Sequence, residues 1–130
     1  MLLVKRKLRI ETERLTLRPP IHSDFREWTA LRIKSRSYLT KWEPTWANDH
    51  LTRKAFTNRV YWAQRSVNSG TALPLFMIRR SDQTLMGAIT LDNLRRGPAQ
   101  SGTLGYWTGE PFARQGFMQE TIDALVHHAF

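Results

Sequence analysis

Residues 100–118 of the chain carry the sequence QSGTLGYWTGEPFARQGFM, which predicts a strand, a tight turn and the start of a helix in immediate succession. The strand is expected over residues 100–108 and the turn over residues 113–116. A helix that begins at such a turn directs unpaired backbone N–H groups and the positive end of its dipole outward, and Arg114 adds a full charge. The segment therefore predicts an anion site. The buried face of the helix is expected to consist of Met118, Ile122, Leu125 and Ala129.

The composition fits one globular domain of 130 residues, of which 41% are hydrophobic, so residues 1–130 are expected to form a single unit. Residues 1–11 are expected to be a flexible basic segment. The chain has no cysteine, which excludes disulfides, zinc–thiolate sites and thiol nucleophiles. No signal peptide or membrane span is recognisable, so a cytoplasmic location without a membrane partner is expected.

The net charge is +9, because 20 Lys and Arg residues face 11 Asp and Glu residues. Such basicity indicates a polyanionic neighbour: nucleic acid, the ribosome, an acidic protein or a phosphorylated cofactor. Two function classes stay open. One is an enzyme with a phosphorylated cofactor. The other is a binding module without turnover that contacts RNA, the ribosome or another polyanion, which steeply salt-dependent binding would reveal.

The first half of the chain predicts one strand and two helices. Residues 14–18 alternate polar and apolar side chains before two prolines, which indicates a strand at a sheet edge. Asp24 and Glu27 have the spacing of a capping box at the start of a first helix. Residues 38–50 are expected to form an ordered loop. A second helix is then expected, capped by Asn48 or Asp49 and ended by Gly70, with Phe56, Val60, Ala63 and Val67 on its buried face.

Strands then follow one another directly. Residues 72–78 are almost entirely apolar, which suits a strand covered on both faces, and residues 85–91 form the next strand. Gly87 within it indicates a bulge or a close backbone approach. Residues 93–99 are expected to turn into the strand at residues 100–108. Consecutive strands with short connections predict an antiparallel meander, and a doubly wound parallel sheet is disfavoured because no helices separate them.

Three motifs carry a family resemblance: TERLTLRP at residues 12–19, LTKWEPTW at residues 39–46, and GYW at residues 105–107 followed by QGFM at residues 115–118. Together with the order of elements, they resemble the GCN5-related N-acetyltransferases, and within them the Rim-type branch of ribosomal-protein-alanine N-acetyltransferases. The resemblance implies an α+β, three-layer α/β/α fold with a mixed, mainly antiparallel sheet. It also implies acetyl-coenzyme A as donor and an amine as acceptor, most simply a protein N-terminus, with ribosome association as a further expectation.

The resemblance also implies the residues that contact coenzyme A. Backbone groups of the third meander strand would meet the thioester and the pantetheine amides, and those residues are Tyr106, Trp107 and Thr108. The pyrophosphate motif maps onto Ala113, Arg114, Gln115, Gly116, Phe117 and Met118. Only Gly116 matches the general motif strictly, and Arg114 stands where the branch usually has glycine. The alternative for Tyr106 and Trp107 is that they are ordinary core and surface residues of a strand.

Three residues of the loop at 38–50 are further candidates. Glu43 lies between Trp42 and Pro44, where desolvation would raise its pKa toward that of a catalytic base. Trp42 and Trp46 are candidates to line an acceptor groove, although aromatic loop residues also simply anchor a loop to the core. The four histidines show no metal-ligand spacing, and no metal site is expected.

The resemblance also implies elements beyond residue 130. In the family the last helix is followed by a strand, a helix and a closing hairpin, which supply the second wall of the cofactor cleft. The chain is therefore expected to be truncated at its C-terminus. The strand at residues 100–108 would then be an open edge, through which two chains could pair as a homo-oligomer.

Overall fold

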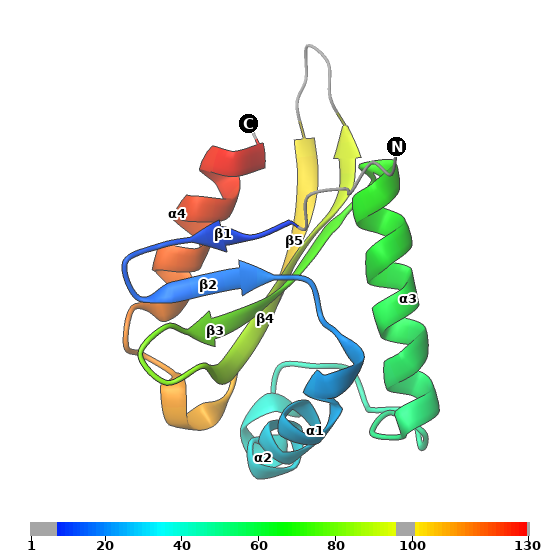
Figure 1. Ribbon diagram of the computed structural model, residues 1–130. Helices are drawn as coiled ribbons and strands as arrows, with labels where there is room; N and C mark the ends of the chain where they lie inside the picture. Colours follow the sequence, from blue (N-terminus) through cyan, green and yellow to red (C-terminus); the bar gives the residue numbers. More distant parts are fainter. Residues whose placement is uncertain (1–7, 96–100, 130) are drawn as a thin grey trace.

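The computed structural model describes residues 8–95 and 101–129. Its centre is a five-stranded sheet in the order β1-β2-β3-β4-β5 (Figure 1). The strands are β1 (Ile10–Glu11), β2 (Leu15–Arg18), β3 (Leu73–Arg79), β4 (Thr84–Arg95) and β5 (Ser101–Thr108). The helices are α1 (Phe25–Lys34), α2 (Arg36–Leu39), α3 (Arg53–Ser69) and α4 (Phe117–Ala129), with short 3-10 turns η1 (His22–Asp24) and η2 (Glu110–Phe112). Each pair of neighbouring strands is antiparallel, which confirms the expected meander.

The helices cover the two faces of the sheet in separate groups. Figure 1 shows α1 and α3 on one side of the sheet and α4 on the other. The apolar core is divided accordingly: Phe117 and Leu125 of α4 lie in one cluster, and Trp28 of α1 and Phe56 of α3 lie in the other. This confirms the α+β class and the three-layer arrangement. The described strands form no parallel pair, so the mixed character of the expected sheet is not seen.

The central strand β3 is apolar along its length because both of its faces are covered. Leu75 and Met77 pack in the cluster beside α4, and Phe76 and Ile78 pack in the cluster beside α1 and α3. Because side chains alternate between the two faces of a strand, consecutive residues of β3 pack in different clusters. The expectation from the apolar run at residues 72–78 is confirmed.

The N-terminal strands differ from the expectation. β2 is not at the edge of the sheet, because Ile10 and Glu11 pair with Leu17 and Thr16 and form β1 outside it. The prolines that suggested an edge follow β2 and interrupt no ladder. Residues 10–11 are thus part of the sheet and not of a flexible segment, while residues 1–7 lie outside the described residues.

The helix caps also differ from the sequence motifs. The carboxylate of Asp24 makes no capping bond to α1 and instead accepts two hydrogen bonds from Arg18, each 2.8 Å long. Glu27 accepts a 2.9 Å bond from the backbone N–H of Leu85, which ties α1 to β4. The N-cap of α3 is Thr52 and not Asn48 or Asp49, because its hydroxyl accepts from the N–H of Ala55 at 3.2 Å.

The C-terminal end of α3 agrees with the prediction, whereas the loop before the helix does not fully agree. Gly70 ends α3 in the left-handed conformation with φ of 72°, as expected of a glycine cap. Residues 36–39 form the short helix α2, so the expected loop at residues 38–50 begins with helical residues. On α3, Phe56, Val60 and Ala63 are buried as predicted, and only the last position differs, where Ser66 is buried and Val67 half-buried.

Strand β4 extends to Arg95, beyond the expected end at Leu91, so part of the turn expected at residues 93–99 is strand. The remaining turn residues, 96–99, lie outside the described part of the chain. A Cβ atom added at Gly87 would lie 2.3 Å from the carbonyl oxygen of Trp107, so the expected close backbone approach is confirmed. The pairing with β3 also shifts register between Met77 and Ile78, opposite this part of β4.

The buried face of α4 is rotated by one residue from the expected one. Leu125 and Ala129 are buried as predicted, but Met118 and Ile122 are only half-buried. The other buried positions of the helix are Phe117 and Thr121. Within residues 8–95 and 101–129, no helix is both long and apolar enough to cross a lipid bilayer.

Candidate functional site

The turn between β5 and α4, where the sequence predicts an anion site, contains two residues with positive φ and backbone N–H groups that are unpaired among the described residues. Arg114 has φ of 62° and Gly116 has φ of 81°, so both residues are in the left-handed region. The arginine thus adopts a conformation that glycine adopts more readily. Within the described part of the chain, the N–H groups of Gly116, Phe117 and Met118 donate to no backbone carbonyl. They are free to meet a ligand in front of the helix.

The motif at residues 12–19 holds this turn in place. The hydroxyl of Thr12 donates to the carboxylate of Glu120 in α4, and the backbone N–H of Arg14 donates to the same carboxylate at 3.0 Å. The Arg14 guanidinium donates to Glu120 at 2.8 Å and to the backbone carbonyl of Gln115 at 3.1 Å. Burial raises the pKa of Glu120, but these hydrogen bonds outweigh it and lower the pKa below its ordinary value. The N-terminal motif therefore clamps the start of α4.

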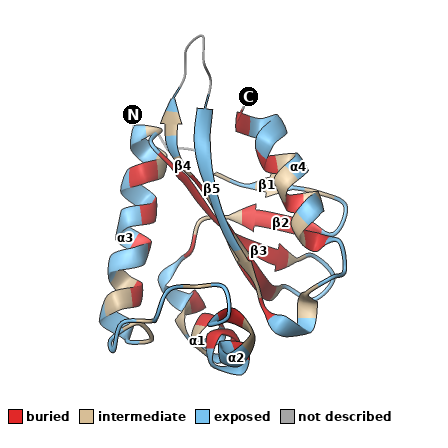
Figure 2. Cartoon of the chain, turned by 180° about the vertical axis from the view of Figure 1, so that it is seen from behind, coloured by how far each residue is buried: buried red, intermediate tan, exposed pale blue. Residues whose placement is uncertain are grey.

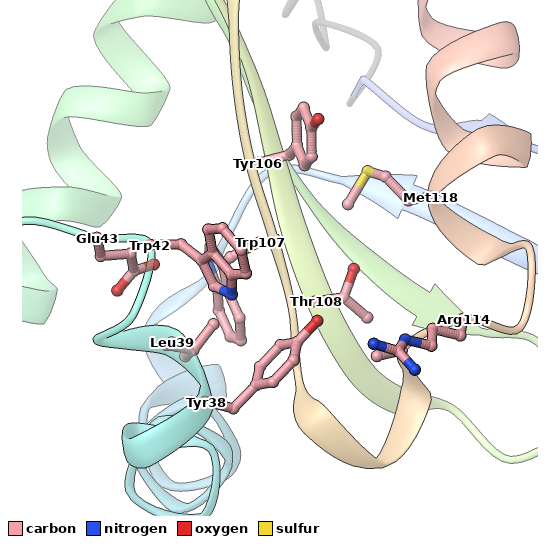
Figure 3. Close-up of a pocket in the computed structure, with 10 residues that line it drawn as sticks. Tyr38, Leu39, Trp42, Glu43, Tyr106, Trp107, Thr108, Arg114 and Met118 are labelled. Atoms are coloured by element: carbon pink, nitrogen blue, oxygen red, sulfur yellow. The ribbon is translucent and has the colours of Figure 1, made fainter.

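A pocket of about 370 Å³ lies between the end of β5, this turn and the region around α2 (Figure 3). Most of the expected cofactor residues share this pocket, although they come from separate elements. In Figure 3 the guanidinium of Arg114 points toward Thr108, and the hydroxyl of Tyr38 points toward the same place from the opposite side. The residues that line the pocket are Tyr38, Leu39, Trp42, Glu43, Tyr106, Trp107, Thr108, Ala113, Arg114 and Met118.

Three expected cofactor residues do not line this pocket with their side chains. Gln115 is exposed, and its amide donates to the carbonyl of Pro111 at 2.9 Å. Gly116 has no side chain to contribute. Phe117 is buried in the core, with the Arg14 guanidinium 4.1 Å from the centre of its ring. Any contact of these three residues with a ligand in the pocket is therefore restricted to backbone groups.

Glu43 is held by an ion pair on the pocket wall. Arg32 donates to both of its carboxylate oxygens, at 3.0 and 2.8 Å, and the indole of Trp46 donates to one of them at 2.8 Å. Burial acts to raise the pKa of Glu43, but the hydrogen bonds from Arg32 and Trp46 and the Arg32 charge lower it overall. The expectation of a raised pKa at Glu43 is wrong, because it considered burial without the buried arginine.

Arg32 lies inside a box of tryptophans. Its side chain is only 5% exposed, although it is an arginine on α1. Its guanidinium carbon lies 4.4 Å from the ring centre of Trp46 and 4.7 Å from that of Trp107. A positively charged planar group against aromatic faces is stabilised by cation–π attraction. The ion pair with Glu43 and this box fix the loop at residues 43–46 against β5.

A second pocket of about 360 Å³ lies on the other side of this ion pair. Trp46 lines this pocket and not the first, whereas Trp42 lines the first and is 79% exposed. Glu43 and Trp107 line both pockets, so only these side chains and their neighbours separate them. The second pocket is lined by Trp28, Arg32, Glu43, Pro44, Thr45, Trp46, Ala47, His50, Arg59 and Trp107.

Several residues that line the two pockets were not predicted from the sequence. Arg32 occupies the position four residues after Trp28 on the buried face of α1, and a charged residue at such a position was a usable signal. Tyr38 and Leu39 carried no signal, because nothing in their local pattern distinguishes a pocket wall from a loop. Among the described residues, no group of three or more His, Cys, Asp or Glu side chains could hold a metal ion.

The acetyltransferase (GNAT) domain family matches residues 14–130. The chain is 23% identical over 122 residues to the ribosomal protein uS5-alanine N-acetyltransferase of Escherichia coli, covering 94% of this chain and 63% of that protein. Its fold is similar to RimJ of Mycobacterium smegmatis in complex with CoA-disulfide, with a TM-score of 0.83, 20% identity, and coverage of 95% of this chain and 62% of that one. It is also similar to the ribosomal-protein-S5-alanine acetyltransferase of Vibrio fischeri, with a TM-score of 0.80, 18% identity, and coverage of 92% and 66%.

The chain thus spans less than two thirds of the length of these relatives. The family match extends over nearly all of the described residues and includes β5, the turn and α4. This chain belongs to the acetyltransferase (GNAT) domain family.

Proposed function

We propose that this domain takes part in the transfer of an acetyl group from acetyl-coenzyme A to an amine, namely the N-terminal α-amine of a ribosomal protein in the cytoplasm. The observation that carries the proposal is the first pocket, in which the end of β5 and the left-handed turn before α4 form one cavity. The name of the E. coli relative, which acts on an alanine of a ribosomal protein, supports the choice of acceptor.

The turn suits the phosphates of coenzyme A. The free N–H groups at the start of α4 and the helix dipole attract a pyrophosphate, and Arg114 adds a charge at the same place. The clamp made by Arg14 and Glu120 keeps these groups aligned before any ligand arrives. Preorganised backbone donors bind an anion with little further loss of conformational entropy.

The end of β5 suits the pantetheine arm and the thioester. β5 is the last strand in the sheet order, so among the described strands its outer backbone groups have no partner. An extended ligand can pair with such an edge, and an N–H group there can stabilise the oxyanion that develops on the thioester carbonyl. We assign this role to the backbone of Tyr106, Trp107 and Thr108, all of which line the first pocket together with Tyr38.

The acceptor side is formed by the tryptophan loop. We assign Trp42 and Trp46 to the walls that the acceptor meets, since they line the first and the second pocket respectively. An α-amine with a pKa of about 8 is already partly neutral near pH 7, so its deprotonation needs only a modest base.

A thermal shift with coenzyme A tests the proposal, because a ligand that binds only the folded state raises the melting temperature. We expect a saturable increase with the unaltered chain. Arg114→Ala should weaken binding by about 1 kcal/mol, as expected for one charged contact that is exposed. Arg65→Ala, an exposed arginine on α3 that lines neither pocket, is the matched control and should leave binding unchanged.

Gly116→Val is the stronger variant. Valine at φ of 81° is strained, and its Cβ would lie 3.4 Å from a guanidinium nitrogen of Arg14. We expect this variant to lose the response to coenzyme A. Circular dichroism must show that the variant remains folded. If the unaltered chain shows no response to coenzyme A but binds RNA with a steep salt dependence, the domain is the polyanion-binding module suggested by its charge of +9.

A further inference from the structure

The second pocket carries more positive charge than its own side chains neutralise. Arg32 is matched by Glu43, which accepts two hydrogen bonds from it. Arg59, on α3, also lines the pocket, and its guanidinium carbon lies 5.3 Å from the ring centre of Trp28. Within residues 8–95 and 101–129, no carboxylate forms an ion pair with Arg59. Arg59 is packed against Trp28 but keeps part of its surface open to solvent, so a ligand entering the pocket can reach it.

Burial and the excess of positive charge lower the pKa values of His50 and Arg59 in this pocket. Burial lowers the pKa of His50, and the charges of Arg32 and Arg59 lower it further, although Glu43 and Asp49 act in the opposite direction. Partial burial also lowers the pKa of Arg59 itself, with a further contribution from the charge of Arg32, although the charge of Glu43 acts in the opposite direction. An arginine stays protonated despite such a shift. The potential in the pocket therefore favours an anion.

The hydrogen-bonding groups of the pocket also require an acceptor. A guanidinium nitrogen of Arg32 lies 2.9 Å from Nε2 of His50. Because arginine can only donate, Nε2 must be the acceptor, and the single proton of the neutral ring is on Nδ1. His50 and Arg59 therefore both carry N–H donors, and three tryptophan rings are among the other side chains that line the pocket. Donors with net positive charge between aromatic faces match a carboxylate on a short side chain.

We propose that the second pocket binds an acidic side chain of the acceptor, with Arg59 as the specificity-determining residue. The inference rests on the proposed function, because it takes a peptide amine as the acceptor. The first and second pockets share Glu43 and Trp107, so an amine at the first pocket and a carboxylate in the second belong to nearby residues of one peptide. The preferred acceptor is then an N-terminus followed within a few residues by aspartate or glutamate.

Tryptophan fluorescence gives a direct measurement. Trp28, Trp46 and Trp107 line the second pocket and are three of the five tryptophans of the chain, so a bound side chain changes their emission. The probes are two short peptides with a free N-terminal alanine. In one the following residues are aspartates, and in the other they are asparagines of nearly the same shape. Each peptide is titrated at low salt into the unaltered chain, the Arg59→Gln variant and the Arg65→Gln variant. The comparison separates the contributions of two arginines on the same helix to peptide affinity.

We expect the unaltered chain to bind the aspartate peptide at least about tenfold more tightly than the asparagine peptide, as for a charge-assisted hydrogen bond. Arg59→Gln should abolish this preference while keeping the melting temperature, and Arg65→Gln should keep it. Equal affinities for the two peptides, no saturable binding of either, or a preference that persists in Arg59→Gln would overturn the inference.

The thermal shift with coenzyme A separates this inference from the proposed function. A chain that responds to coenzyme A but does not discriminate between the peptides contradicts the acidic pocket alone. A chain that discriminates between the peptides through Arg59 without any response to coenzyme A supports the pocket and contradicts the acetyltransferase proposal.

Discussion

The guanidinium of Arg14 is hydrogen-bonded to the carboxylate of Glu120, with 2.8 Å between Nε and Oε1. This pair joins the start of β2 to the first turn of α4 across more than a hundred residues of sequence. The same guanidinium also reaches the carbonyl of Gln115 and covers the ring of Phe117. Neither residue of the pair lines the first pocket. Together, however, they hold the turn at residues 113–116 in position, and this turn does line the pocket.

Loss of this clamp should destabilise the protein and weaken coenzyme A binding together. Glu120→Ala leaves the N–H of Arg14 without its acceptor and the hydroxyl of Thr12 with only a long 3.5 Å bond to the carbonyl of Leu15, and the Glu120 side chain is only 21% exposed. We expect the free energy of unfolding to fall by about 1–2 kcal/mol in urea denaturation. Glu11→Ala, which breaks the exposed pairs with Arg9 and Arg80, is the control and should change stability by less than about 0.5 kcal/mol.

Gly87→Ala should disturb the pairing of β4 with the end of β5, which lines the first pocket. The new methyl group would lie 2.3 Å from the carbonyl oxygen of Trp107, and rigid backbone cannot yield as a flexible side chain does. We expect a loss of about 2 kcal/mol in unfolding free energy. Gly105→Ala adds the same methyl group to β5, where nothing lies within 4 Å. The two glycines should therefore differ clearly in thermal denaturation, and equal melting temperatures would contradict the close approach of β4 and β5.

Glu43→Gln distinguishes an anchoring carboxylate from a catalytic base. If the ion pair with Arg32 fixes the loop, the variant should lose about 2 kcal/mol of stability, because Arg32 is left charged and buried. Asp82→Asn removes a similar two-pronged pair with Arg79 at an exposed turn and should change stability little. A fall in turnover of the Glu43→Gln variant without a loss of stability would instead identify Glu43 as the base.

His50 should make the folded state sensitive to mild acid. Its pKa is lowered in the folded protein, by burial first and then by Arg32 and Arg59, from an unfolded value of about 6.5. The unfolded state therefore binds more protons between the two values, and stability falls as the pH decreases through about 6.5 toward the lowered pKa. His50→Gln should flatten this part of the stability curve, measured by urea unfolding between about pH 7.5 and 5. Parallel curves for the two proteins would contradict the shift.

The local parts of the fold were predictable from sequence because they depend on neighbouring residues. The apolar run of β3 requires cover on both faces, and Gly70 is a low-cost residue for a left-handed cap. The strand–turn–helix segment also has the predicted order over its described residues, 101–118. Its positive φ at Arg114 could be anticipated only from the glycine usual at that position, because arginine itself gives no sign of it.

The rest depended on contacts between distant residues. Thr121 is buried in place of Met118 because its hydroxyl donates to the carbonyl of Phe117 at 2.8 Å, and a search for apolar periodicity excludes threonine. Asp24 fits a capping box and an ion pair equally well, and only the fold brings Arg18 to it. The lowered pKa of Glu43 likewise has its cause in another helix, at Arg32.

Strand β5 should mediate self-association, because among the described strands it is at the edge of the sheet and it is exposed along most of its length (Figure 2). An open edge pairs readily with a second copy, and its exposed side chains include Leu104 and Tyr106. We expect sedimentation velocity to show a monomer–dimer equilibrium, which Leu104→Lys shifts toward monomer because it replaces an exposed apolar side chain by a positive charge on both paired edges. Val126→Lys, an equally exposed site on α4, is the control and should leave the equilibrium unchanged unless the dimer forms through that helix.

The same edge is assigned above to the pantetheine arm, so saturating coenzyme A should also dissociate the dimer. A monomer at all concentrations would contradict pairing through β5. A dimer that keeps its affinity in the presence of coenzyme A would show that ligand and second chain use different surfaces. The two variants then locate the dimer: weakening by Leu104→Lys alone places it along β5 and removes the pantetheine arm from that edge, whereas weakening by Val126→Lys alone places it on α4.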